Sequence, residues 1–348
     1  MTRIQSLLEL IDQTGARCRL FDLGRRVAKL SSTTFARVEQ GRIPYPQPYL
    51  HHAWVGLLLW HPDSPQRNAV WFLKLPLDEQ GFLVQAVRDD LLHRLMQNIG
   101  GLVEDGNDAL KDNPFSFKPD DEKMALFHAH AGLVLRQSAS RYYEYAQHYF
   151  AGQLAPENWV NLGYQGIADL VVRLEQGRNE ALLTDAIGWL PAEPLGALCR
   201  ALEHVEPGHR LLQALEPRLD SALACDRDSD GGLLAALVRA VSNSPSQSLR
   251  KALLQRVLAS PRALEAEVIV ALATRCCESL KDPELLQPFL ERLAAGEAGQ
   301  AGFSRVLADL MFMPSLRGPI MAALRNPERS ETLSRAIGEM FGQGMGEG

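Results

Sequence analysis

Hydrophobic and polar positions follow two different spacings along this chain. Up to about residue 100, apolar runs of strand length stand between helical patterns, whereas beyond residue 120 apolar residues recur only at helical spacing. The clearest strand signals are Ala53–Trp60 and Ala69–Leu75, which are joined by His61-Pro62-Asp63-Ser64-Pro65, a sequence typical of a turn. The pattern therefore predicts a β-hairpin.

Other segments of the first hundred residues are predicted to complete a small sheet with helices. Residues 16–21 alternate between polar and apolar side chains, which predicts a half-exposed strand, and residues 26–30 are expected to pair with it. Helical spacing is present over residues 4–13, 32–40 and 82–99. We interpret residues 1–100 as an α+β domain built on an antiparallel sheet.

The rest of the chain is predicted to be helical. Residues 101–119 are rich in Gly, Asp, Asn and Pro and are expected to form a linker, and residues 342–348 a flexible tail. No strand is expected in the domain between them, residues 120–341. Its predicted helices are 121–150, 157–175, 180–190, 193–204, 210–224, 233–241, 247–258, 264–280, 284–294, 303–311, 316–324 and 331–341.

The later helices occur in pairs. The first helices of three successive pairs begin near Leu233, Leu264 and Phe303, so the repeat is roughly 30–40 residues long, as in helical-repeat proteins. Such a pair buries its apolar stripe only by stacking on the next pair. The pattern predicts a HEAT-like α-solenoid, with an irregular helical bundle as the alternative.

Composition limits the class of protein. The 348 residues are 46% hydrophobic and 22% charged, which is ordinary globular usage, and the length favours two domains. The formal charge of −6 argues against a protein that coats nucleic acid over its whole surface. Five scattered cysteines indicate reduced thiols, and no apolar run reaches the roughly 18–20 residues of a membrane span. A cytoplasmic protein that does not bind membranes is expected.

Motifs for cofactors, metals and nucleophilic catalysis are absent from the sequence. It has no phosphate-binding glycine loop, no Gly-x-Ser-x-Gly, no Cys-x-x-Cys and no His-Glu-x-x-His. Residues 226–231, Asp-Arg-Asp-Ser-Asp-Gly, begin like a calcium loop, but Leu237 stands where the bidentate Glu is needed. We expect neither a cofactor nor a metal site.

Basic residues are concentrated near the N-terminus. The segment from Arg3 to Arg42 has eight basic and four acidic residues, and Arg17, Arg19 and Arg26 lie on or beside the predicted strands. These three arginines are candidate binding residues. A regulator that binds nucleic acid through this face is the first alternative function, and its affinity would fall steeply with salt.

Carboxylates near the predicted hairpin are a second group of candidates. Asp78 and Glu79 directly follow the second strand and could bind a ligand or cap the following helix. Asp89 and His93 are four residues apart on one helical face, where a carboxylate could orient an imidazole for proton transfer. An enzyme that uses these four residues is the second alternative.

A tyrosine-rich helix supplies the third group of candidates. Tyr142, Tyr145 and Tyr149 fall on one face of the predicted helix 121–150. Aromatic side chains with polar tips are common in interfaces, and they also pack against neighbouring helices with their hydroxyls reaching water. Either role fits the spacing.

Three stretches together carry a family resemblance. They are Phe-Asp-Leu-Gly-Arg-Arg at 21–26, Trp-Phe-Leu-Lys-Leu-Pro-Leu-Asp-Glu-Gln-Gly at 71–81, and the segment from Asn-Pro-Phe at 113–115 to Phe-His-Ala at 127–129. The chain resembles, over nearly its whole length, the bacterial family catalogued as domain of unknown function 3549, whose noted motif is Leu-Asp-Glu, here 77–79. The resemblance implies a cytoplasmic bacterial protein and assigns no catalytic residue.

The sequence as a whole predicts an interaction scaffold. Stacked helical pairs form concave grooves, which commonly hold peptides or partner proteins. A protein partner is therefore expected and no catalytic activity, with the nucleic-acid regulator and the enzyme as alternatives.

Overall fold

A computed structural model describes residue 4 and residues 6–97, 113–225 and 231–343. The chain divides into two compact units. The first, the sheet unit, holds Met1–Ser138 and Phe312–Pro314, and the second, the helical unit, holds Ala139–Met311 and Ser315–Gly348. The sequence pattern placed the start of the helical domain earlier, at residue 120.

In its described residues, the sheet unit has an antiparallel four-stranded sheet and four helices. Its strands lie in the order β2-β1-β3-β4, and β3 and β4 form the predicted hairpin. The elements are α1 (Leu7–Gln13), β1 (Arg17–Asp22), β2 (Ala28–Leu30), α2 (Ser32–Glu39), β3 (His52–His61), β4 (Ser64–Pro76), α3 (Gln85–Gln97) and α4 (Asp121–Val134).

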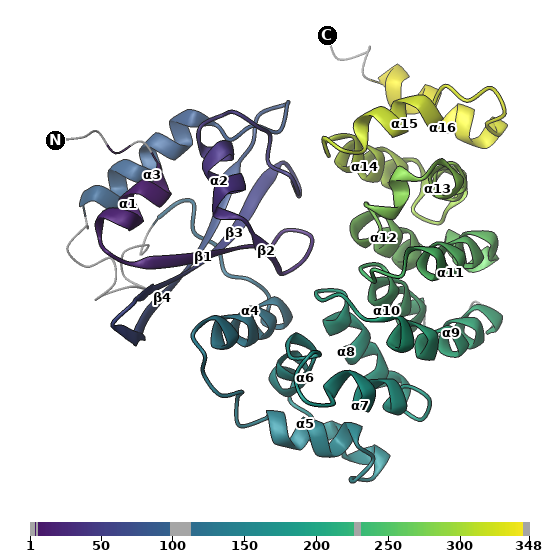
Figure 1. The fold of residues 1–348 in the computed structure, drawn as a ribbon. Helices are drawn as coiled ribbons and strands as arrows, with labels where there is room; N and C mark the ends of the chain where they lie inside the picture. The colour runs from purple at the N-terminus through teal and green to yellow at the C-terminus, as the bar shows by residue number, and fades with distance from the viewer. Residues whose placement is uncertain (1–3, 5, 98–112, 226–230, 344–348) are drawn as a thin grey trace. The chain divides into compact units, whose positions relative to one another are not determined.

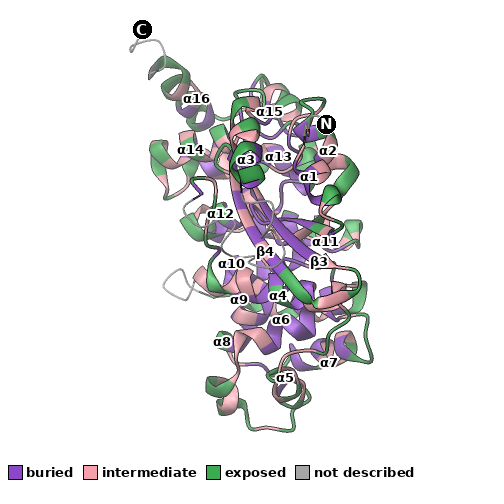
Figure 2. Cartoon of the chain, turned by 90° about the vertical axis from the view of Figure 1, so that its left-hand side faces the viewer, coloured by how far each residue is buried: buried purple, intermediate pink, exposed green. Residues whose placement is uncertain are grey.

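One face of the sheet and the helices α1, α2 and α3 enclose the core of this unit. Alternate residues of β3, such as Val55 and Leu57, point into it because successive strand side chains face opposite sides. They meet Leu10 of α1, Phe35 of α2 and Leu95 of α3 there. Figure 2 shows β3 mainly as buried, whereas β4 alternates between buried and half-buried residues and is exposed near the end of the hairpin.

Helix α4 lies against the opposite face of the sheet. The ring of Phe127 packs edge-on against Phe21 of β1 and Phe72 of β4, with ring centroids 5.2 and 5.0 Å apart. Gly56 of β3 makes this approach possible, because a Cβ there would lie 2.8 Å from Phe127 and 2.8 Å from Leu23. A sheet covered on both faces buries its central strands.

The helical unit contains helices and short 3₁₀ turns. They are α5 (Tyr143–Phe150), η3 (Pro156–Asn161), α6 (Tyr164–Val172), α7 (Asn179–Ala186), α8 (Ala192–Leu202), α9 (His209–Ala224), α10 (Gly231–Val241), α11 (Gln247–Ala259), η4 (Pro261–Leu264), α12 (Ala266–Arg275), η5 (Ser279–Lys281), α13 (Pro283–Ala295), α14 (Gly299–Met311), α15 (Arg317–Ala323) and α16 (Glu331–Gln343). The α+β class with a helical C-terminal region is confirmed.

These helices stack in two rows (Figure 1). Helices α6, α8, α10, α12 and α14 pack one on the next in the first row, and α5, α7, α9, α11 and α13 do the same in the second. Contacts between the two rows include those of α5 with α6, α9 with α10, and α13 with α14. The apolar residues of these helices are buried where the helices pack on one another.

Three predicted helices are interrupted in the structure. Residues 157–175 contain η3 and α6, and residues 264–280 contain α12 and the start of η5. The spacing predicted a single helix over residues 121–150, but α4 ends at Val134 and α5 begins at Tyr143. Arg136 adopts a left-handed conformation with φ 56°, and the Gln137 amide donates to the Gly132 carbonyl over 2.8 Å. This is the hydrogen bonding of a helix end that glycine usually closes.

Other boundaries differ by a few residues. The strand predicted from residue 26 begins at Ala28, which leaves Arg26 in the preceding turn. The helix predicted from residue 82 begins at Gln85. Most of the predicted linker, the calcium-like loop before Gly231 and most of the predicted tail lie outside the described residues. Among the helices described, none is both long and apolar enough to cross a membrane.

Candidate functional site

The first row of helices carries an open groove of about 910 Å³. Its walls come from α6, α8, α10, α12 and the η3 segment, all within the helical unit. Small residues form much of its surface, among them Gly196 and Ala197 of α8 and Gly232 of α10. Val160 and Val270 are exposed at 69% and 42% and add apolar surface. A groove of this kind can accommodate the backbone and side chains of a bound segment.

The helices that form the groove run parallel. At their C-terminal ends, Arg239 in the last turn of α10 and Arg275 in the last turn of α12 both face Glu203, which follows the end of α8. At the N-terminal ends, Gly231 at the start of α10 lies beside Glu265, the N-cap of α12. A Cβ added to Gly231 would lie only 2.6 Å from a carboxylate oxygen of Glu265. Equivalent helix ends therefore lie side by side.

Glu203 is the centre of a buried ion-pair cluster. Its Oε1 lies 2.8 Å from Nε of Arg275 and 3.2 Å from Nε2 of His204, whereas its Oε2 lies 4.0 Å from Nε of Arg239. Burial by itself would raise the pKa of Glu203, but the contact with His204 and the charge of Arg275 outweigh it and lower the pKa to about 2. The carboxylate is therefore charged at neutral pH and fixes three helix ends.

Charges are distributed unevenly along the groove. Glu193 and Glu267 stand in the first turns of α8 and α12, and Arg200 and Arg239 in the last turns of α8 and α10. All four line the groove. Because the helices are parallel, the carboxylates lie toward one edge of the groove and the guanidinium groups toward the opposite edge.

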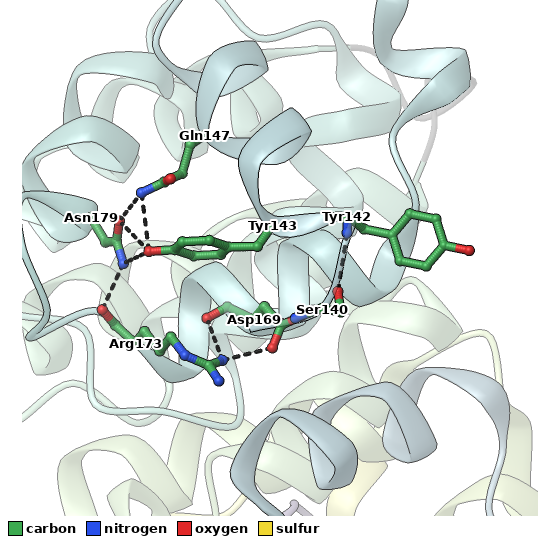
Figure 3. A network of polar contacts seen from close by, with 7 residues as sticks. All are labelled: Ser140, Tyr142, Tyr143, Gln147, Asp169, Arg173 and Asn179. Atoms are coloured by element: carbon green, nitrogen blue, oxygen red, sulfur yellow. Dashed lines mark hydrogen bonds and ion pairs between the residues drawn. The ribbon is translucent and has the colours of Figure 1, made fainter. Parts of the chain in front are cut away.

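A polar network fixes the first helices of this unit (Figure 3). Arg173 donates from Nη1 to Oδ1 of Asp169 over 2.6 Å, and the Ser140 amide donates to Oδ2 over 3.0 Å. Asn179 of α7 donates to the Arg173 carbonyl over 2.9 Å and to the Tyr143 hydroxyl over 2.8 Å. Asp169 lies on α6, Arg173 follows its C-terminal end, and both are buried, so the network ties α5, α6 and α7 together.

The three candidate tyrosines have different surroundings. Tyr145 and Tyr149 donate from their hydroxyls to the carbonyls of Asn158 and Pro156, over 3.1 and 2.9 Å, and Tyr149 is fully buried. Tyr142 precedes α5 and is 40% exposed, with its ring pointing away from the polar network in Figure 3. The structure thus leaves Tyr142 accessible and uses Tyr149 in packing.

The candidate arginines of the sheet unit lie on two elements. Arg17 and Arg19 are exposed on the same side of β1, opposite Trp60 and Leu58 of β3. Arg26 is half-buried in the turn after β1. The structure therefore brings Arg17 and Arg19 together on one side of β1 and places Arg26 in the turn.

The four candidate residues of the enzyme hypothesis, all within the described part of the chain, form no hydrogen bond or ion pair with one another. Three of them form contacts with residues nearby in the sequence, and the fourth is exposed. Oδ1 of Asp78 accepts from the amides of Gln80 and Phe82, each over 2.9 Å, so it stabilises the turn rather than the start of α3, and Glu79 is exposed. Asp89 pairs with neighbouring Arg88 over 2.6 Å. His93 instead contacts Gln97, with 3.0 Å between the His93 and Gln97 nitrogens. No contact between Asp89 and His93 is present in the described part of α3.

Metal-binding side chains do not gather in the part of the chain that is described. No group of three or more His, Cys, Asp or Glu residues there is placed to hold an ion. The adjacent Cys276 and Cys277 are both buried.

Sequence reasoning missed the groove residues Arg200, Arg239 and the ion-pair centre Glu203. A signal for the arginines was present: Arg200, Arg239 and Arg275 each stand near the end of an apolar helix, at intervals close to the predicted repeat. A charged residue that recurs at the repeat spacing occupies equivalent places in a stack. The spacing of these arginines therefore marks the side of the first row at which α8, α10 and α12 end.

The three stretches with the family resemblance meet in the sheet unit. Phe127 from the third stretch packs against Phe21 from the first and Phe72 from the second. Lys123 donates from Nζ to the carbonyl of Leu23 over 2.9 Å, which ties α4 to the end of β1. The stretches are far apart in sequence and adjacent in the fold.

The family model described as "Protein of unknown function (DUF3549)" matches residues 2–341. The chain belongs to this family. The resemblance seen in the sequence is thereby confirmed. No curated protein and no solved structure matches the chain.

Proposed function

We propose that this DUF3549 protein is a cytoplasmic interaction scaffold, and that its helical unit is a HEAT-like α-solenoid that holds a segment of a protein partner in the groove. The observation that carries the proposal is the open groove along α6, α8, α10 and α12, with small residues on its walls and exposed valines beside them. Stacked helices offer such surfaces to extended or helical segments of other proteins.

The contacts around the groove support a rigid binding surface. The Glu203 cluster fixes the C-terminal ends of the three helices α8, α10 and α12, and the network around Asp169 and Arg173 fixes α6. A preformed groove loses little conformational entropy on binding, which favours affinity.

A substitution that fills the groove tests this function. Ala197 lines the groove and is half-exposed, so Ala197→Trp places an indole where the partner segment would lie. Ala181 on α7 is exposed and does not line the groove, so Ala181→Trp is the matched control. Thermal unfolding verifies that both variants fold.

The measurement is affinity capture from nuclease-treated lysate at increasing salt, with bound proteins identified by mass spectrometry. We expect a partner that is retained by the wild type and by Ala181→Trp and lost with Ala197→Trp. An identical set of proteins on all three baits contradicts the proposal. Retention of nucleic acid that is lost with salt favours the alternative, a regulator that binds through Arg17 and Arg19, which are exposed together on β1.

A further inference from the structure

We propose that Arg239 is the specificity residue of the groove and binds a carboxylate side chain of the partner segment. This inference rests on the proposed function and adds the chemistry of the ligand to it: a peptide segment with an acidic residue at one edge of the groove and a basic residue at the other. Three observations on the groove lead to it.

The guanidinium of Arg239 has hydrogen-bonding capacity to spare. Its buried Nε has no hydrogen-bond partner among the described residues, and the nearest carboxylate oxygen, Oε2 of Glu203, is 4.0 Å away. The side chain keeps 27% of its exposure and lines the groove. The buried Nε is close to Glu203, so a carboxylate in the groove would meet the exposed remainder of the planar guanidinium, whose donor fork matches a carboxylate.

Glu203 is already engaged elsewhere. Its Oε1 faces both Arg275 and His204 at 2.8 and 3.2 Å, so the one carboxylate is shared with a second guanidinium. Arg275 and Arg239 therefore both face Glu203. At the same edge of the groove Arg200 supplies a second guanidinium in addition to that of Arg239, and this positive charge favours an anionic group from the partner.

The opposite edge of the groove has the opposite charge. Glu193 and Glu267 line this edge. On α8, Glu193 stands seven residues before Arg200, and seven residues correspond to about 10 Å along a helix. A segment that lies along the helices meets guanidinium groups at one end and carboxylates at the other. The groove thus favours a segment with an acidic and a basic side chain about 10 Å apart, in one orientation only.

The test is selection of random dodecapeptides displayed on phage against the purified full chain. Four baits are used: wild type, Arg239→Gln, Ala197→Trp, and Arg210→Gln as a control, because Arg210 is an exposed arginine of α9 in the other row. We expect wild type and Arg210→Gln to enrich peptides with one fixed acidic position, and Arg239→Gln to lose that preference.

Affinities of the selected peptides sharpen the test. Measured by fluorescence anisotropy, Arg239→Gln should weaken the best peptide about tenfold, Arg239→Lys should lie between it and the wild type, and Arg210→Gln should change nothing. Replacing the peptide's acidic residue by the corresponding amide should weaken its affinity for the wild type about tenfold as well. The same replacement should not weaken its affinity for Arg239→Gln any further.

Two results would overturn the proposals, and they are distinguishable. Peptides that bind the wild type, are excluded by Ala197→Trp and show no acidic position leave the scaffold standing and refute the role of Arg239. Failure to enrich any peptide, or enrichment that Ala197→Trp leaves unchanged, refutes the groove as a binding site and the specificity residue with it.

Discussion

The Tyr45 hydroxyl donates a hydrogen bond of 2.6 Å to Oδ1 of Asp22, and both side chains are buried. Burial raises the pKa of Asp22 to about 7, although the hydrogen bond from Tyr45 and the nearby charge of Lys123 act in the opposite direction. The pair joins the end of β1 to the loop that precedes β3. It also makes the stability of the sheet unit depend on pH.

The sheet unit should lose stability as the pH rises from about 4 to 7. The folded unit holds a proton on Asp22 up to about pH 7, whereas the unfolded chain releases it near the ordinary carboxyl pKa. The stabilising contribution is therefore complete below about pH 4 and is lost as the pH approaches 7, with a size of a few kcal/mol. Asp22→Asn should flatten this slope.

Urea unfolding followed by tryptophan fluorescence measures this effect. In a background with Trp159→Phe and Trp189→Phe, the remaining tryptophans are Trp54, Trp60 and Trp71, all in the sheet unit. Glu39 contributes a slope of the same sign, because burial raises its pKa to about 7, so Glu39→Gln is the companion variant. If the free energy of unfolding still falls between about pH 4 and 7 in a variant with both substitutions, the assignment of this pH dependence to Asp22 and Glu39 is wrong.

The helical unit should show the opposite pH dependence. The pKa of Glu203 is lowered to about 2 in the folded state, so its contribution is present above about pH 4.5 and is lost as the pH falls toward 2. Glu203→Gln should cost on the order of 3 kcal/mol at pH 7, since it removes the buried charge that lies 2.8 Å from Arg275. Far-ultraviolet circular dichroism, which is dominated by the helices, follows this unfolding, and equal acid stability of wild type and variant would disprove the role.

Gly56 should not tolerate a side chain. An added Cβ would lie 2.8 Å from Leu23 and 2.8 Å from Phe127, closer than packed carbon atoms allow. Gly56→Ala should therefore destabilise the sheet unit by about 1–3 kcal/mol. Gly188→Ala, which meets no atom within 4 Å, is the control and should change the free energy of unfolding by less than about 0.5 kcal/mol.

The Asp169–Arg173 pair should behave as a coupled unit. Asp169→Asn leaves the buried Arg173 guanidinium without its 2.6 Å ion pair and should cost about 3–5 kcal/mol. Replacing both residues by apolar side chains should cost clearly less than the sum of the single changes. Denaturant unfolding of the two single variants and the double variant provides the cycle, and strictly additive values would show that the two side chains act separately.

Charge reversal at Arg17 and Arg19 separates a binding role from a structural one. Both side chains are exposed on β1, so Arg17→Glu with Arg19→Glu should change the free energy of unfolding by about 0.5 kcal/mol or less. If this face binds a partner, as the sequence predicts, the double variant captures less of it from lysate. Unchanged capture would remove these arginines from the binding surface.

Local sequence patterns determined the secondary structure and the fold class of this protein. Alternating and continuous apolar runs around a Pro-rich turn are enough to specify the hairpin of β3 and β4, because side chains on a strand must alternate between its two faces. The 3.6-residue spacing likewise predicted most of the helices beyond residue 150. It failed at Arg136, where the left-handed helix end is occupied by a residue that gives no local sign of it.

The candidate site was decided by tertiary structure. Periodicity predicts which face of a helix is buried, but it does not say which helix end lies beside which. Glu203, Arg239 and Arg275 come together only because α8, α10 and α12 stack in parallel, so that equivalent turns of successive helices in the row become neighbours. The groove and its two charged edges arise from the same packing, since its walls come from different helices of the row.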